Sequence, residues 1–208
     1  QGITSNELAS NAVTTVKIAD FNVTTVKIAD LNVTTDKIAD SNITPTKLSQ
    51  PLTVATAKNS TSGTSIDFTG IPSWVKRVTV MFNGISTNGI TRIAVQLGTS
   101  SGFTTSGYIS FCGYISSAGS QDASSVTNGF GWWNGSSGDI EYGHMTITNI
   151  SANSWVSSCS GGFSSPGAFF ATSGGGSVSL SGTFDRIRIT TTNGTDIFDA
   201  GSINIMYE

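Results

Sequence analysis

The sequence predicts an all-β protein in two parts: a repeat-built stalk over residues 1–50 and a β-sandwich knob with jelly-roll-like connections over residues 51–208. The first fifty residues divide into five ten-residue units, and the remainder alternates apolar and polar residues between Gly and Asn turns. Only 11% of the residues are charged, and the net charge is -3, yet the chain carries 11 Phe and 4 Trp. Such a chain is foldable and must present a polar, weakly charged surface.

The repeat is visible when the five units are aligned: QGITSNELAS, NAVTTVKIAD, FNVTTVKIAD, LNVTTDKIAD and SNITPTKLSQ. Thr fills the fourth position of every unit, and Lys fills the seventh position of the last four. Two positions are always large and apolar: the third (Ile3, Val13, Val23, Val33, Ile43) and the eighth (Leu8, Ile18, Ile28, Ile38, Leu48). An apolar residue therefore recurs every five residues, and the ten-residue period fits neither the seven nor the eleven of a coiled coil.

Each unit predicts a short extended piece, N-V-T, followed by one helical turn, V-K-I-A-D. We expect the hydroxyls of Thr15, Thr25 and Thr35 to cap these turns. Across each turn a Lys should face the Asp three residues later; the pairs are Lys17–Asp20, Lys27–Asp30 and Lys37–Asp40. Because exposed pairs of this kind contribute only about 0.2–0.5 kcal/mol, they adjust the turn and do not create it.

The third- and eighth-position residues form two apolar columns along the repeat, and a single stalk chain cannot bury them. Each unit offers two large apolar side chains, worth roughly 3–6 kcal/mol when buried, whereas fixing ten residues costs on the order of 10–20 kcal/mol of backbone entropy. The alternative, a flexible tandem linker, is disfavoured by the recurring columns. Three parallel copies in register would stack the two positions in layers around one axis, so the repeat predicts a homotrimer.

From Thr4 to about Leu48, the units reading N-V-T-T-x-K-I-A-D resemble the stalk repeats of bacteriophage tail fibres. The closing segment GTFDRIRITTTNGTDIFDAGSINIMYE resembles the last strands of tail-fibre tip domains. The resemblance implies a virion protein, extracellular when functional, that joins an upstream fibre segment and attaches to a host-surface glycan or protein receptor. Comparable repeats occur in cellular surface adhesins, so that function stays open, as do a tail-spike polysaccharide depolymerase and a purely structural cap.

Alternating residues predict the strands of the knob. In WVKRVTVMFNGIS, Val78, Val80 and Phe82 point one way while Arg77, Thr79 and Met81 point the other. The loop at residues 86–89 leads into TRIAVQLG, which alternates likewise and predicts a hairpin with the preceding strand. Further strands are expected at Tyr108–Ser116, Ile140–Thr148, Ser154–Ser160, Ser177–Ser181, Phe184–Thr190 and Ser202–Tyr207.

Composition excludes two classes of partner. The sequence pI is near 5.0, and no Lys or Arg occurs between Arg92 and Arg186. Nucleic-acid binders concentrate basic residues on one face, so we expect no nucleic-acid partner. No apolar run approaches the roughly 18–20 residues of a membrane span, so we expect no membrane insertion.

The sequence predicts a protein that is not an enzyme. The one histidine, His144, would have to serve any triad, and the G-x-S-x-G match at Gly98–Gly102 is not followed by a helical pattern. Asp139 and Glu141 could share a strand face and act as a glycosidase pair, but exposed charges bordering a hairpin are the commoner explanation. We therefore assign no catalytic residue.

No metal or cofactor is expected either. Asp196 and Asp199 lack the dense oxygen spacing of a calcium loop and are interpreted as turn residues. Cys112 and Cys159 are too few for a disulfide framework, so we expect small, buried, reduced side chains.

Aromatic residues gather between Phe103 and Phe170 among Ser, Gly and Asn. Tyr108 and Phe111 are expected in the core. Trp132 and Trp133 are adjacent, so in an extended chain they face opposite sides and one of them can stay exposed beside the Asn134-Gly135 turn; burial of both in the core or a trimer interface is the alternative. An exposed ring among amides and hydroxyls suits a sugar face. The predicted ligand-binding residues are therefore Trp132, Trp133, Asn134 and Tyr142.

Overall fold

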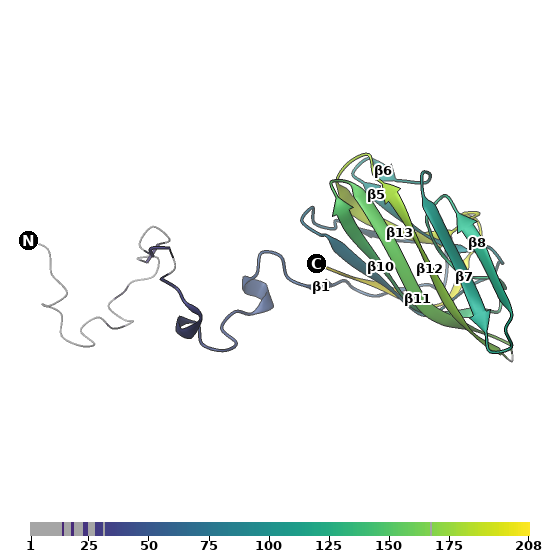
Figure 1. Cartoon of the computed structure of the whole chain (residues 1–208), viewed down its shortest axis with the longest axis horizontal. Coiled ribbons are helices and arrows are strands. Elements are labelled where there is room, and N and C mark those ends of the chain that lie inside the picture. The colour runs from purple at the N-terminus through teal and green to yellow at the C-terminus, as the bar shows by residue number, and fades with distance from the viewer. Residues whose placement is uncertain (1–13, 15–17, 19–22, 25–27, 31, 167) are drawn as a thin grey trace, which may run out of the picture. The chain divides into compact units, whose positions relative to one another are not determined.

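The computed structural model describes residues 14, 18, 23–24, 28–30, 32–166 and 168–208 (Figure 1). It divides the chain into two compact units, Gln1–Ser49 and Gln50–Glu208. The elements described are strands and 3₁₀ turns. Among them no helix is long and apolar enough to cross a membrane.

Two consecutive units of the repeat have the same local structure. Each has an extended Thr followed by a 3₁₀ turn, η4 (Thr35–Lys37) and η5 (Pro45–Lys47). The Lys that ends each turn folds back onto its own unit: Lys37 Nζ donates to the Asn32 carbonyl, and Lys47 Nζ to the Asn42 carbonyl, each over 2.6 Å.

The predictions of a threonine cap and of a Lys–Asp ion pair are both wrong at the unit that contains η4. The residue before η4 is Thr34, which makes no side-chain capping bond, and Thr35 lies inside the turn. Lys37 forms no ion pair with Asp40, because its ammonium group binds the Asn32 carbonyl. The corresponding predictions for Thr15, Thr25, Lys17–Asp20 and Lys27–Asp30 involve residues outside the described part of the chain.

The apolar columns of the repeat are exposed in a single chain. Val23, Val33 and Ile43 of the third position are each 54% exposed, and the eighth-position residues described are exposed as well. No residue that the structure describes in one copy of the repeat covers them.

The second unit contains two antiparallel sheets. The nine-stranded sheet has the order β1 (Thr53–Val54), β14 (Phe198–Tyr207), β4 (Arg77–Thr87), β10 (Ile140–Ser151), β11 (Ser154–Ser165), β12 (Ala168–Ser179), β7 (Ile109–Ser116), β8 (Gln121–Val126), with β2 (Lys58–Asn59) also paired to β14. The five-stranded sheet has the order β3 (Ser65–Thr69), β13 (Phe184–Thr191), β5 (Ile93–Thr99), β6 (Gly102–Phe103), with β9 (Phe130–Trp132) also paired to β5. The predicted all-β architecture is confirmed, and the two sheets are consistent with a β-sandwich.

The predicted hairpin between β4 and β5 is wrong. β4 pairs with β14 and β10 in one sheet, whereas β5 pairs with β13 and β9 in the other. The connecting loop is held in place by the segment before β14: Asn88 donates its amide to the Ile197 carbonyl over 2.9 Å, and its side chain accepts the Ile197 amide. The chain therefore crosses between the sheets at residues 88–92.

The core lies between the two sheets. The expected alternation of β4 is confirmed, since Val78, Val80 and Phe82 are buried while Arg77 is exposed. Tyr108 is buried as expected, and its hydroxyl accepts the Leu97 amide over 2.7 Å. Every residue of β5 is buried, and β9 and β13 flank it within its own sheet.

The two thiols lie on either side of one glycine. Cys112 is paired in register with Gly174, which is itself paired with Cys159. Both cysteines are buried, as expected, and burial raises the pKa of Cys112 to about 11 and that of Cys159 to about 12. Two strand spacings separate their Cα atoms by about 9–10 Å, beyond the roughly 7 Å limit of a disulfide.

We therefore predict two free thiols in the purified protein. In denaturant without reductant, a thiol-reactive chromophore should titrate both cysteines, whereas in the native state it should react with neither over the same time. A mass increase of two hydrogens on reduction would contradict this.

Candidate functional site

Both tryptophans of the predicted site are buried, so the expectation that one stays exposed is wrong. Trp132 lies in the main core, with its ring centroid 4.6 Å from that of Phe82. Trp133 faces the opposite side, as an extended chain requires, but a second apolar cluster covers it there: its ring lies 4.7 Å from Tyr114 and 3.5 Å from the Arg92 guanidinium. β9 has core on both of its sides.

Asn134 is also completely buried, where it holds loops together. Its amide nitrogen donates to Thr87 Oγ1 over 3.1 Å and to the Thr91 carbonyl over 2.9 Å. The main-chain carbonyl of Asn134 accepts a hydrogen bond from the Arg92 guanidinium. The side chain is thus engaged in the fold and does not reach the surface.

Asp139 and Glu141 are buried carboxylates, and their interpretation as exposed hairpin charges is wrong. Glu141 Oε2 accepts the indole N–H of Trp132 over 2.9 Å, and Asp139 Oδ2 accepts the Gly135 amide over 3.1 Å. Burial, together with the nearby charge of Asp139, raises the pKa of Glu141 to about 9 despite the Trp132 bond and the charge of Arg92. With side chains 2% exposed or less, the pair cannot flank the bond of a bound polysaccharide.

Asp196 stabilises a turn, in agreement with its interpretation, whereas the interpretation of Asp199 as a turn residue is wrong, because Asp199 lies in β14. Asp196 Oδ2 accepts the hydroxyl of Thr91 over 2.7 Å and its amide over 3.2 Å, and Asp196 Oδ1 accepts the amide group of Asn193 over 2.6 Å. Asp199 accepts the Ser86 hydroxyl. Among the described residues, no group of three or more His, Cys, Asp or Glu could hold a metal ion.

The triad candidates do not meet. The Gly98–Gly102 match falls in the turn between β5 and β6, which is followed by a strand and not by the helix that a nucleophile elbow requires. His144 is exposed on β10, in register with Ser160 of β11 and Met81 of β4.

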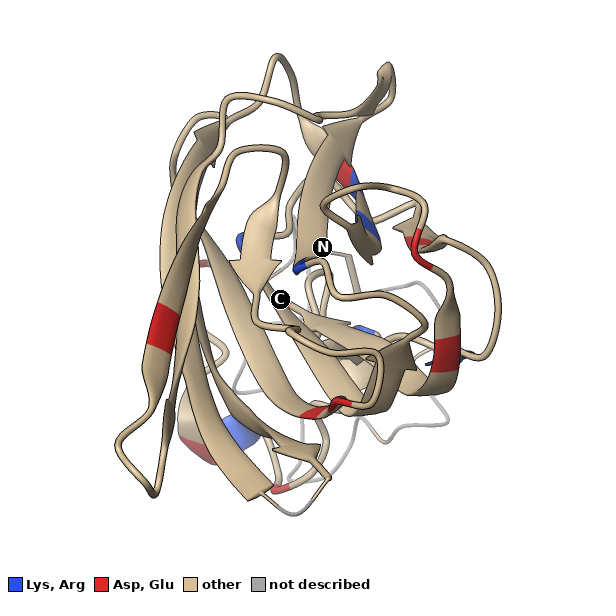
Figure 2. Ribbon diagram, turned by 90° about the vertical axis from the view of Figure 1, so that its right-hand side faces the viewer, with Lys and Arg blue, Asp and Glu red and all other residues tan. Residues whose placement is uncertain are grey.

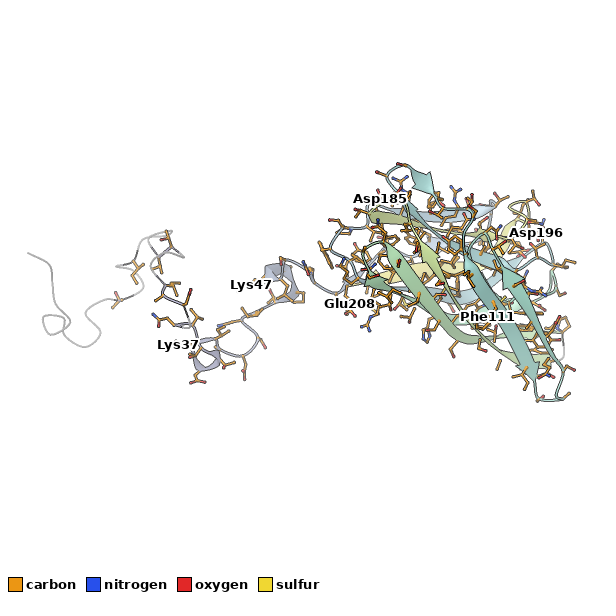
Figure 3. The ribbon with its side chains drawn as sticks, turned by 45° about the horizontal axis from the view of Figure 1, so that its top comes forward. Lys37, Lys47, Phe111, Asp185, Asp196 and Glu208 are labelled. Atoms are coloured by element: carbon orange, nitrogen blue, oxygen red, sulfur yellow. The ribbon has the colours of Figure 1, made fainter. Side chains whose placement is uncertain are left out.

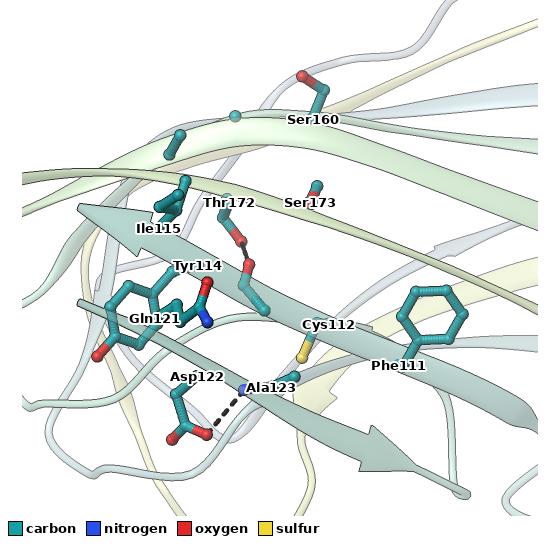
Figure 4. A pocket seen from close by; sticks show the side chains of 13 residues that line it. Phe111, Cys112, Tyr114, Ile115, Gln121, Asp122, Ala123, Ser160, Thr172 and Ser173 are labelled. Atoms are coloured by element: carbon teal, nitrogen blue, oxygen red, sulfur yellow. Dashed lines mark hydrogen bonds between the residues drawn. The ribbon is translucent and has the colours of Figure 1, made fainter. Parts of the chain in front are cut away.

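The outward face of the nine-stranded sheet carries a shallow hollow of about 700 Å³, which we call the β7 hollow (Figure 4). Phe111 and Ile115, both on β7, rise beside a floor of small residues: Gly113, Ala123, Ser160, Gly161, Ala171 and Ser173. Gln121 and Asp122 of β8 complete its edge. Asp122 is the one charged side chain among the described residues that line it.

Phe111 was expected in the core, and that expectation is wrong. It is 61% exposed on the outward face of β7 (Figure 3), while its neighbour Cys112 points inward. Both faces of β7 are apolar, since Ile109, Phe111 and Ile115 alternate with Cys112 and Tyr114, so alternation alone did not distinguish the inward face.

A smaller recess of about 300 Å³, the Tyr142 recess, lies on β10, β11 and β12. It is lined by Tyr142, Gly162, Phe163, Ser164, Phe169 and Phe170. Tyr142 is 48% exposed and Phe169 80% exposed, whereas Phe163 and Phe170 stack at 4.5 Å behind them. Of the four predicted ligand-binding residues, Tyr142 alone reaches a surface recess.

No protein-family model, curated protein or solved structure matches this chain.

Proposed function

We propose that the chain is the end of a homotrimeric bacteriophage tail fibre, which attaches to a host cell surface by binding a neutral glycan in the Tyr142 recess without cleaving it. The observation that carries the proposal is the recess itself, an exposed tyrosine and phenylalanine beside uncharged hydroxyl and amide groups. Sugar rings stack on aromatic faces while polar groups at the edge bind their hydroxyls.

The polar partners come from neighbouring strands. Ser164 lines the recess, and Asn83 of β4 is exposed and in register with Tyr142. The Tyr142 hydroxyl adds a donor and an acceptor. Because none of these groups is charged, binding should change little with salt.

The repeat supports the trimer. The third- and eighth-position side chains that the structure describes are exposed in one copy, and parallel copies would cover them around a shared axis. An upstream fibre segment would precede the repeat, and the virion would carry the assembled fibre outside the cell. Three parallel knobs would raise the avidity of weak single sites through effective concentration.

The topology supports a tip domain of jelly-roll type. The order β1/β2–β14–β4–β10 in one sheet and β3–β13–β5–β9 in the other is that of an eight-stranded jelly roll. Strands β11, β12, β7 and β8 extend the first sheet beyond it. Both the Tyr142 recess and the β7 hollow involve this extension.

A depolymerase is less well supported than a binding tip. A glycosidase needs two carboxylates flanking the sugar bond. No carboxylate lines the Tyr142 recess among the described residues, and the β7 hollow has Asp122 alone. An adhesin would share the binding geometry and would differ in the segments that anchor it.

The test is a glycan array probed with the labelled full chain. We expect Tyr142→Ala and Phe169→Ala each to weaken binding to neutral cell-surface glycans roughly ten-fold, since an aromatic contact of this kind is worth about 1–1.5 kcal/mol. Ile150→Ala is the matched control, because Ile150 lies on the same strand, is 61% exposed and lies outside the recess. Unchanged binding by both recess variants would contradict the site, and release of soluble oligosaccharide by the wild type would contradict the absence of cleavage.

A further inference from the structure

We propose that the β7 hollow is the surface on which the sandwich of a second copy of this chain docks. This inference rests on the homotrimer proposed above and adds the face that the copies share. The hollow lies on the β7 side of the Tyr142 recess and borders it, since Ala171 on the floor of the hollow pairs with Gly162 of the recess.

The outward face of β7 exposes three large apolar side chains to solvent. Ile109 is 77% exposed, Phe111 61% and Ile115 54%, and all three project from the outward face of β7. Phe111 and Ile115 border a floor that includes the small residues Ala123, Ala171 and Ser173, and Ile109 extends this ridge along β7 beyond the hollow. A contiguous exposed apolar surface of this kind marks an interaction site.

The strands around the hollow are poor in charged residues, as the core of a protein interface is. Strands β7, β11 and β12 lie side by side in the sheet and contain no Asp, Glu, Lys or Arg. The five-stranded sheet instead carries an ion-pair cluster: Arg188 binds Asp67 through two bonds of 2.7 Å, and Arg186 binds Asp185. Most of the ribbon in Figure 2 is accordingly free of charged residues. Interface cores are depleted of charge and enriched in aromatic residues.

The stalk indicates why the occupant is a second copy. The apolar columns of the repeat are exposed through Leu48, and β1 begins at Thr53. The intervening residues span at most about 3.3–3.6 Å each, so copies joined along the repeat hold their sandwiches next to one another. An uncharged apolar face on each sandwich then meets its neighbours at high effective concentration.

The test compares the accessibility of two engineered thiols in the full chain. Ser173→Cys places a thiol on the floor of the hollow, and Ser101→Cys places one in the turn between β5 and β6; both serines are exposed in a single chain. The native Cys112 and Cys159 are buried and give the background. A bulky polyethylene-glycol maleimide should label Cys at position 173 roughly ten-fold more slowly than Cys at position 101, because a packed interface excludes it.

A second variant sharpens the result. Phe111→Glu puts a charge on the ridge, is compatible with the fold because the side chain is exposed, and should raise the labelling rate at position 173 to that at position 101. Ile90→Glu, at a loop residue that is 68% exposed, is the matched control and should leave the protection intact. Light scattering on the same samples separates the two proposals. A trimer with equal labelling rates would overturn the docking surface alone, whereas a monomer would overturn the homotrimer as well.

Discussion

The free energy of unfolding is expected to fall by roughly 2–5 kcal/mol between about pH 5 and pH 9, owing to Glu141. Burial raises the pKa of this carboxyl group to about 9 in the folded protein, although the bond from the Trp132 N–H opposes the shift. Over that range the folded state holds a proton that the unfolded state has released, so rising pH favours unfolding. The stabilising contribution is complete below the ordinary pKa of Glu and is lost as the pH passes through about 9. Denaturant titrations at several pH values measure the slope.

Glu141→Gln is the informative variant. Its amide keeps the shape of the side chain, can still accept the Trp132 N–H bond and has no proton to release, so this part of the pH dependence should disappear. Asp122→Asn is the matched control, because Asp122 is exposed and should leave the slope of the wild type unchanged. Equal slopes for the wild type and Glu141→Gln would show that Glu141 is not the group responsible.

Replacing Ile18, Ile28 and Ile38 together with Asp should abolish the stalk while leaving the sandwich folded. In a trimer each of these side chains would face the axis, where an unpaired carboxylate costs several kcal/mol. Trypsin reports the outcome, because the repeat carries Lys17, Lys27, Lys37 and Lys47. We expect cleavage at these lysines to be roughly a hundred-fold faster in the variant, with the strand signal of the sandwich retained.

The corresponding triple Val variant is the control for the loss of side-chain volume. It keeps an apolar residue at each position and should resist trypsin as the wild type does. If the wild type is cut as fast as the Asp variant, the columns are not buried and the repeat is a linker.

The sequence predicted the fold class well because strand alternation is a local property. Val78, Val80 and Phe82 were placed on the buried face by period two alone, and the structure agrees. Pairing partners are not local. The short loop after β4 resembled a hairpin, yet the long-range partners β14 and β13 draw β4 and β5 into different sheets.

Glycine-rich strands were partly missed. The sequence predicted strand at residues 177–181, whereas β12 begins at Ala168 and includes three consecutive glycines. Gly174 and Gly176 are required there, since a Cβ atom would come within 2.5 and 2.6 Å of the carbonyl oxygens of Phe111 and Ile109 on β7. Glycine has low strand propensity, so this close approach of two strands could not be foreseen from composition.

The prediction of the ligand-binding site was wrong for the two tryptophans, because it required one of them to be exposed to solvent. The reasoning that Trp132 and Trp133 face opposite sides was correct, but β9 has packed residues on both sides. Phe111 was expected to be buried and is exposed. Both faces of β7 are apolar, so only the arrangement of the sheets decides which face is covered. Tyr142 is half exposed because Glu141 and Met145 occupy the inward face of its strand, and its role in ligand binding stays a prediction.

The most direct test of the proposed fibre is the molar mass of the full chain at micromolar concentration, measured by light scattering. A homotrimer gives three times the 21.5 kDa of one chain, with the apolar columns of the repeat covered by neighbouring copies. A mass of one chain would contradict it, because the exposed Val23, Val33 and Ile43 would then have no partner and the repeat no reason to recur.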